Sequence, residues 1–251
     1  MTAVGIIPAR YSASRFPGKP LARIAGIPMI QRVWQGAMAA KRLRTAIVAT
    51  DDERIADVCR SFGADVAMTR PDHPTGTDRL AEVAAGLEDE IIVNIQGDEP
   101  LIEGRVVDAV VEALIGDPDV SMSTLIHAAD SSSVADPNRV KVVVDRAGRA
   151  LYFSRSAIPA VRADGATPEY WQHVGLYAYR RPFLLEFVTL EQSPAEVAEQ
   201  LEQLRALENG YQIGCAMIEG WRSIPVDVPE DVSRVEAALR DAHRTRQTGR
   251  P

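Results

Sequence analysis

The chain has 251 residues and a mass of 27.4 kDa, enough for one large domain with a sizeable buried core. Its net charge of −7 argues against a general nucleic-acid-binding surface, which needs a basic face. No apolar run approaches the ~20 residues that span a bilayer, and the N-terminus does not resemble a secretory signal. We therefore expect a cytoplasmic protein with no membrane span and no nucleic-acid partner. The two cysteines, Cys59 and Cys215, lack metal-ligand spacing and are interpreted as buried thiols.

The first half of the chain alternates apolar strands with amphipathic helices. Strands are expected at 3–9, 45–50, 64–68 and 90–96, and helices at 28–41, 51–62, 75–87 and 104–116. This alternation is typical of βαβ units, and continuous apolar runs such as IIVNI suit strands covered on both faces. The predicted fold is an α/β, three-layer α/β/α sandwich with a mostly parallel sheet.

The pattern changes after about residue 120. Further strands are expected at 120–126, 139–145, 150–154, 173–180 and 211–217, with a loop at 155–172 and helices at 181–190, 194–208 and from Pro229. Because no long helix separates the first four of these strands, this region is expected to be a β-rich insertion or a mixed part of the sheet.

A basic loop, PARYSASRFPGKPL (8–21), follows the first strand directly. Ligands of open α/β sheets bind beyond the carboxyl ends of the strands, so a site is expected here. Its cations Arg10, Arg15 and Lys19, with the hydroxyls of Ser12 and Ser14, suit a triphosphate. The spacing matches neither a P-loop nor the GxGxxG motif of dinucleotide-binding proteins. A Rossmann-type oxidoreductase is therefore not supported. A solvated basic loop is the alternative.

Carboxylates stand in two further segments. The segment IQGDEP (95–100) places Asp98 at the end of a buried strand, and VDVPED (226–231) places Asp227 before the last helix. Magnesium prefers one or two carboxylates together with water and phosphate oxygens. Taken by itself, however, Asp227 is better interpreted as a loop or helix-entry carboxylate, since Pro229 follows.

Several segments resemble the 3-deoxy-manno-octulosonate cytidylyltransferases, also called CMP-Kdo synthetases, within the sugar nucleotidyltransferases. Besides the basic loop, the matching segments are TDDERIADV, RPDHPTGTDRLAE, VNIQGDEPLI, NRVKVVVD, ALYFSRSAIP, QHVGLYAYR, EQLEQLRALENG and VDVPEDVSRVE. They occur in the order of the family and cover nearly the whole chain.

The resemblance implies a fold of the nucleotide-diphospho-sugar transferase type, Mg²⁺ as cofactor, and a homodimer. It implies the reaction of CTP with an acidic octulosonate, giving CMP-Kdo and pyrophosphate for an outer-membrane glycolipid or related glycan. We expect no covalent enzyme intermediate. The implied single domain (1–251) divides into a nucleotide-binding half (1–118), a sugar-binding and dimerisation region (119–210), and a closing strand and helix (211–245).

The resemblance also assigns site residues. The catalytic group is Arg15, Lys19, Asp98 and Asp227, of which Asp98 and Asp227 are the metal ligands. The nucleotide-binding group is Arg10, Ser12, Ser14, Arg15, Lys19, Thr75, Gly76, Thr77, Arg79 and Gln96. The sugar-binding group is Tyr152, Ser154, Arg155, His173, Gly175, Tyr177, Glu202 and Gln203, with Arg155 and His173 facing the carboxylate region.

Other interpretations stay open at this point. Thr77 could be a plain helix N-cap, His173 a structural histidine, and EQLEQLR an ordinary amphipathic helix, with Arg205 undecided. Among functions, the rivals are a cytidylyltransferase for another acid sugar such as an amino-Kdo or a sialic acid, a nucleotidyltransferase for a sugar phosphate, and a non-catalytic nucleotide-binding homologue.

Overall fold

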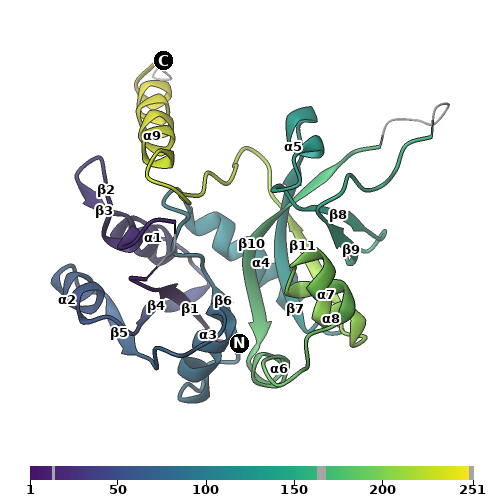
Figure 1. Cartoon of the computed structure of the whole chain (residues 1–251), viewed down its shortest axis with the longest axis horizontal. Helices are drawn as coiled ribbons and strands as arrows, with labels where there is room; N and C mark the ends of the chain where they lie inside the picture. Colours follow the sequence, from purple (N-terminus) through teal and green to yellow (C-terminus); the bar gives the residue numbers. More distant parts are fainter. Residues whose placement is uncertain (13–14, 163–167, 249–251) are drawn as a thin grey trace.

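A computed structural model describes residues 1–12, 15–162 and 168–248, and a mixed, mostly parallel sheet forms its centre (Figure 1). In spatial order the sheet contains β11 (Ile213–Met217), β7 (Met122–Ala128), β10 (Trp171–Arg180), β6 (Ile91–Asn94), β1 (Ala3–Ala9), β4 (Leu43–Thr50) and β5 (Asp65–Met68). β10 is antiparallel to both of its neighbours, β6 and β7, whereas β1, β4, β5 and β6 run parallel. The hairpin of β8 (Lys141–Val144) and β9 (Ala150–Ser154) is joined to β10 through β8.

Helices cover both faces of the sheet. One face carries α1 (Met29–Met38), α2 (Glu53–Ser61) and α4 (Gly104–Gly116), and the other carries α3 (Gly76–Ala85), α6 (Arg181–Phe187) and α8 (Gln203–Glu208). The side chains of β1 alternate between two cores, with Ile7 in the first and Val4 and Ile6 in the second. The expected three-layer α/β/α sandwich is thereby confirmed.

Smaller elements lie around this sandwich. They are the 3-10 turn η1 (Lys19–Leu21), the hairpin of β2 (Arg23–Ile24) and β3 (Ile27–Pro28), the short helices α5 (Ser131–Ala135) and α7 (Pro194–Glu199), and α9 (Asp231–Thr248). In Figure 1, α9 stands at the upper left, where Val235 packs with Ile24 in a third, small core. No helix in the described ranges is long and apolar enough to cross a membrane.

The helix expected at 194–208 is two helices. α7 ends at Glu199, the next residue Gln200 has a φ of 52° in the left-handed region, and α8 starts at Gln203. The intervening corner is held from outside, because the Ser154 hydroxyl and the Arg155 N–H both donate to the carboxylate of Glu199. The turn therefore depends on contacts with β9, which periodicity within the segment cannot reveal.

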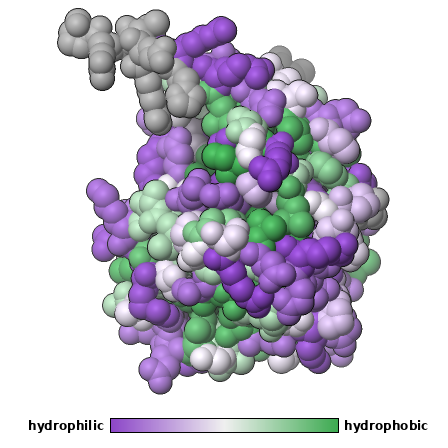
Figure 2. All heavy atoms as spheres, turned by 90° about the vertical axis from the view of Figure 1, so that its left-hand side faces the viewer, coloured by the Kyte–Doolittle hydropathy of each residue, from purple (hydrophilic) through white to green (hydrophobic). Residues whose placement is uncertain are grey.

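The surface combines hydrophilic and hydrophobic residues. On the face shown in Figure 2, hydrophilic residues predominate and smaller hydrophobic areas lie between them. Cys59 and Cys215 are free thiols, and burial raises the pKa of each to about 12, so neither is a reactive thiolate.

Candidate active site

The basic loop leaves β1 at the carboxyl edge of the sheet and turns back on itself. Gly18 makes this turn with a φ of 71°, and its N–H donates to the carbonyl of Tyr11 at 2.8 Å. A Cβ at Gly18 would lie 3.2 Å from the Tyr11 ring, so the tight loop requires glycine. Ser12 lies exposed in this loop, whereas Ser14 lies outside the described residues.

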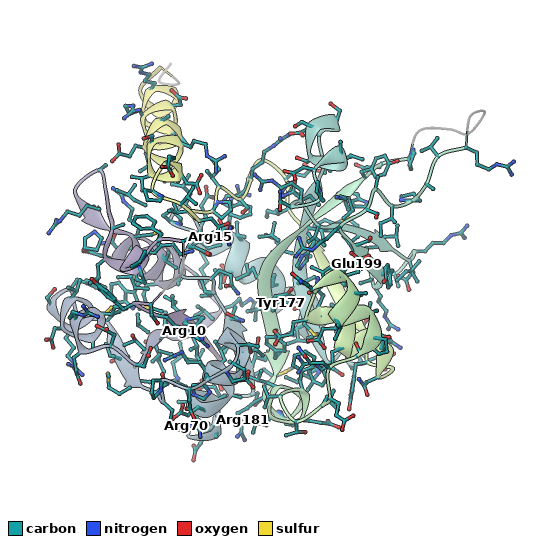
Figure 3. All side chains as sticks on the ribbon, viewed as in Figure 1. Arg10, Arg15, Arg70, Tyr177, Arg181 and Glu199 are labelled. Atoms are coloured by element: carbon teal, nitrogen blue, oxygen red, sulfur yellow. The ribbon has the colours of Figure 1, made fainter. Side chains whose placement is uncertain are left out.

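The four residues expected to be catalytic come together at this edge. Lys19 Nζ lies 2.8 Å from Asp98 Oδ2 and 3.7 Å from Asp227 Oδ1, while Arg15 Nη2 lies 3.6 Å from the same Asp227 oxygen. Figure 3 shows Arg10 and Arg15 on the side of the molecule that carries β1 and β4. Three segments far apart in the sequence thus supply two cations and two carboxylates to one place.

A strap of residues 218–230 brings Asp227 to this cluster. Its Val226 N–H donates to the carbonyl of Asp98 at 3.0 Å, and its Trp221 indole N–H donates to the carbonyl of Leu101 at 3.1 Å. At the start of α9, Asp231 accepts the N–H groups of Asp227 and Val228. Because Asp231 accepts these N–H groups, the carboxylate of Asp227 faces the two cations instead of serving as a helix cap.

The two aspartates fit the requirements of a magnesium ion. Both carboxylates approach the single ammonium of Lys19, which shows that the space between them accommodates a positive charge. Among the described residues, no group of three or more His, Cys, Asp or Glu side chains is placed to hold a metal. A metal at Asp98 and Asp227 would therefore take its remaining ligands from water and phosphate oxygens, as magnesium commonly does.

The segment 73–79 lies against the basic loop. Arg10 Nη2 donates to the carbonyl of Thr75 at 2.8 Å, and Thr75 caps α3 in a reciprocal capping box with Asp78. Thr77 is not the cap; its hydroxyl donates to Glu202 Oε2 at 2.6 Å and so connects the segment to the α7–α8 corner. Gly76 lies next to Pro8.

Arg79 is not at the surface of this site. Its side chain is completely buried, paired with Asp51 at 3.1 Å and bonded to the hydroxyl of Thr69. Burial lowers its pKa. In this structure its guanidinium supports the 73–79 segment from within the interior, and the expected contact of Arg79 with the nucleotide stays a prediction. Gln96, by contrast, lies at the edge, with its amide donating to Asn94 at 3.3 Å.

A cavity of about 280 Å³ adjoins the cluster, and we call it the sugar cavity. It is lined by five residues of the predicted sugar-binding group: His173, Gly175 and Tyr177 from β10, and Glu202 and Gln203 from the α7–α8 corner. Figure 3 shows Tyr177 on β10 in the middle of the molecule. The cavity lies beside the carboxylate cluster, because its lining includes Glu99, which follows Asp98, and Pro225, which stands two residues before Asp227.

Three residues of the predicted sugar-binding group do not line the cavity. Ser154 Oγ donates to Glu199 Oε1 at 2.6 Å, and the Arg155 guanidinium donates to the carbonyls of Glu199, Gln200 and Pro137. Tyr152 is exposed on the hairpin. Ser154 and Arg155 hold the end of α7, near Glu199 in Figure 3, so a role of Tyr152, Ser154 and Arg155 in sugar binding stays a prediction.

Burial controls the titration of the cavity residues. It lowers the pKa of His173 to about 3, so the imidazole is neutral, and its Nε2 lies 2.9 Å from the hydroxyl of Thr124. Burial also raises the pKa of Glu99 to about 8 and raises the pKa of Glu202. Glu99 Oε2 and Gln203 Nε2 are buried without a hydrogen-bond partner among the described residues. Unpaired buried polar atoms of both kinds suit a ligand rich in hydroxyl groups.

Arg205, undecided from the sequence, lies away from the cavity. Its guanidinium binds Glu196 through two hydrogen bonds, Nε to Oε2 at 2.8 Å and Nη2 to Oε1 at 2.5 Å. Both side chains are buried. This ion pair connects α7 to α8, so Arg205 fixes the corner that presents Glu202 and Gln203 to the cavity.

Sequence reasoning did not assign several polar residues of the cavity wall. Arg139, Gln172 and Ser223 line the sugar cavity and also a neighbouring cavity of about 350 Å³. Arg139 and Gln172 lie within matched segments, as the second residue of NRVKVVVD and the first residue of QHVGLYAYR. The available signal was a polar residue at the start of an expected strand. Ser223 carries no such signal, because its place in the cavity depends on the hydrogen bond from the strap to Glu99.

Comparison with known proteins agrees with this geometry. A model of the cytidylyltransferase family matches residues 4–213. A 3-deoxy-manno-octulosonate cytidylyltransferase of Solibacter usitatus is 54% identical over 233 residues, covering 92% of each chain. One from Syntrophotalea carbinolica is 53% identical over 250 residues, covering 96% of this chain and 99% of the relative.

A solved structure points the same way. CMP:2-keto-3-deoxy-manno-octonic acid synthetase, solved in complex with CTP, superposes with a TM-score of 0.92 at 43% identity. The match covers 96% of this chain and 100% of that one. The resemblance stated from the sequence motifs is confirmed, and the chain belongs to the cytidylyltransferase family.

Proposed function

We propose that this protein transfers CMP from CTP to 3-deoxy-manno-octulosonate (Kdo), giving CMP-Kdo and pyrophosphate. The observation that carries the proposal is the cluster of Arg15, Lys19, Asp98 and Asp227 at the mouth of a polar cavity. The relatives with this name and the related CTP complex support both the nucleotide and the sugar acid.

The chemistry follows from the arrangement. The anomeric C2 hydroxyl of the sugar attacks the α-phosphorus in line, the new O–P bond forms, and the bond to the β-phosphate oxygen breaks. Lys19 and Arg15 bind and neutralise the phosphates that leave as pyrophosphate. Asp98 and Asp227 would hold Mg²⁺, which supplies Lewis-acid polarisation of the α-phosphate when bound. The cavity residues Tyr177, Glu202 and Gln203 orient the sugar for attack.

The direct test is pyrophosphate release by the purified protein with CTP, Mg²⁺ and one candidate sugar at a time. We expect release with Kdo, loss of release when EDTA removes the metal, and recovery on adding Mg²⁺ in excess. Release only with an amino-Kdo or a sialic acid would keep the nucleotide site and overturn the sugar. Absence of release with every sugar, despite CTP binding in calorimetry, would favour a non-catalytic nucleotide-binding protein.

We further infer that two copies associate through the region around β9 and the end of β11. Leu151 and Met217 are 60% and 50% exposed there, and Tyr152 and Val161 are also exposed. Exposed large apolar side chains are a common feature of interfaces. Sedimentation velocity is expected to give about twice the chain mass of 27.4 kDa. A monomer mass at assay concentration would contradict this, and Leu151→Arg is expected to shift the mass toward the monomer.

Location in the cytoplasm remains a prediction. The free thiols of Cys59 and Cys215 agree with a reducing compartment.

A further inference from the structure

The sugar cavity needs a positive charge if its occupant is an acid. A buried or half-buried carboxylate is held well by charge-assisted hydrogen bonds, above all from a guanidinium. The described residues that line the cavity include two glutamates, Glu99 and Glu202, and a single Lys or Arg, which is Arg139. The wall is otherwise neutral, so Arg139 is the group with which a sugar carboxylate can pair.

The other cations near the cavity are engaged elsewhere. Arg155 donates to three backbone carbonyls, and the fully buried Lys141 Nζ donates to the carbonyls of Asp136, Arg139 and Arg155. His173 is neutral because burial lowers its pKa to about 3. Of the pair that the family resemblance nominated for the carboxylate, Arg155 is held at backbone carbonyls and is not among the residues that line the cavity, and His173 is uncharged.

Arg139 has a fixed backbone and an available side chain. Its N–H donates to the carbonyl of Asp136 at 3.1 Å, and its own carbonyl accepts from Lys141 Nζ at 2.5 Å. Its guanidinium makes no hydrogen bond or ion pair with any residue in the described part of the chain, although the residue is half-buried. A half-buried arginine with five unpaired N–H donors suits a ligand that brings its own acceptors.

Arg139 also shares the cavity with residues adjoining the carboxylate cluster. In a 2-keto sugar acid the carboxyl carbon is bonded directly to C2, which carries the attacking hydroxyl. The cation that binds the carboxylate must then lie at the end of the cavity nearest the phosphates. Arg139 shares its cavity wall with Glu99, the neighbour of Asp98, and with Ser223 and Pro225 of the strap that carries Asp227.

We propose that Arg139 is a specificity-determining residue that binds the carboxylate of the sugar acid at the reacting end of the cavity. This inference rests on the proposed function and adds to it the residue that selects acidic over neutral sugars. Arg139 acts on binding of the ground state and the transition state alike, because the carboxylate charge does not change during the transfer. Its loss therefore raises KM for the sugar acid far more than it lowers kcat.

The test compares Arg139→Gln and Arg139→Lys with the wild-type protein. The matched control is Arg146→Gln, an exposed arginine in the turn between β8 and β9. Arg139→Gln is expected to raise KM for the sugar acid about 10- to 100-fold, as loss of a charge-assisted hydrogen bond does, with kcat within about threefold of wild type. KM for CTP is expected to be unchanged, Arg139→Lys to be intermediate, and Arg146→Gln to match wild type.

A substrate analogue provides a second readout. With the C1 carboxamide of the sugar, the wild-type protein is expected to lose affinity by a similar factor, whereas Arg139→Gln should hardly distinguish the amide from the acid. An unchanged KM for the sugar acid in Arg139→Gln would overturn the assignment. So would a rise in that KM confined to Arg155→Gln in a protein of unchanged thermal stability.

Failure of the proposed function looks different from failure of this assignment. If the wild-type protein released no pyrophosphate with any sugar acid, both would fall, because Arg139 would have no carboxylate to select. If wild type turned over Kdo and Arg139→Gln behaved identically, the function would stand and the role of Arg139 alone would be wrong.

Discussion

Asp98→Asn is expected to lower kcat for pyrophosphate release by about 10³-fold, the scale on which removal of a charge-stabilising group acts in a preorganised site. The substitution keeps the shape of the side chain and removes one of the two carboxylates that converge on Lys19. Steady-state kinetics with CTP, Kdo and Mg²⁺ measure the loss. In calorimetry without divalent metal, Asp98→Asn should bind CTP as tightly as wild type or more tightly. The substitution removes a negative charge next to the triphosphate.

A cycle of variants separates a shared metal site from two independent roles. If Asp98 and Asp227 hold one ion, Asp227→Asn loses a similar factor, and the double variant loses little more than the worse single variant. Asp72→Asn is the control, since that carboxylate is 73% exposed and away from the cluster. Multiplication of the two losses in the double variant would contradict a common ion, and full activity of Asp98→Asn would contradict the site.

Glu196→Gln is expected to lower the free energy of unfolding by about 3 kcal/mol, because it removes the closer counter-charge of the buried Arg205 guanidinium and leaves only Glu202, at 3.8 Å. The Glu196 and Arg205 side chains are 5% and 8% exposed, so water cannot replace the lost partner. Urea denaturation followed by circular dichroism measures the change. Because the pair fixes the α7–α8 corner, KM for the sugar should also rise.

Removing both members of the pair is the control. Glu196→Leu combined with Arg205→Met is expected to restore most of the stability, since apolar residues of similar volume replace a buried ion pair at little cost. A double variant no more stable than Glu196→Gln would show that the loss arises from packing.

The same pair predicts a pH dependence. Burial by itself would raise the pKa of Glu196, but hydrogen bonds from Arg205 and the Ser193 N–H outweigh burial and lower it. A carboxyl whose pKa is depressed on folding stabilises the protein above its unfolded pKa, here 4.5, and loses that contribution as the pH falls through the folded value. The difference in stability between wild type and Glu196→Gln should therefore narrow below about pH 4.5.

The sequence pattern within each segment predicted most of the helices and strands, because the residues that start and end them lie within the same segment. β1, β9 and α4 begin and end where alternation, apolar runs and glycines indicate. The break at Gln200 escaped because EVAEQLEQLRAL continues the helical pattern across it, and the bend is imposed by Ser154 and Arg155 from a distant strand. The antiparallel placement of β10 between β6 and β7 likewise depends on the whole sheet.

The site was predictable where strand ends determine it. Lys19 and Asp98 follow parallel neighbouring strands, so their meeting could be expected from sheet geometry. The direction of a side chain could not be read in the same way. Arg79 and Arg155 carry charges suited to ligands, yet one is turned into the interior and the other toward backbone carbonyls. The importance of Arg139 could not be predicted from its own segment, because it depends on the absence of another Lys or Arg among the described residues that line the cavity.

The central strand β10 also limits how the enzyme can open and close. Its ladder joins β6 of the nucleotide half on one side and β7 of the sugar half on the other. A hinge between the halves would have to break these backbone hydrogen bonds, so the two sides are expected to move as one rigid body. Substrate entry and product release are then left to the parts outside the ladder, the basic loop, the strap and the α7–α8 corner. Any gating that sets the turnover rate should arise from these peripheral segments rather than from a jaw-like motion of two domains.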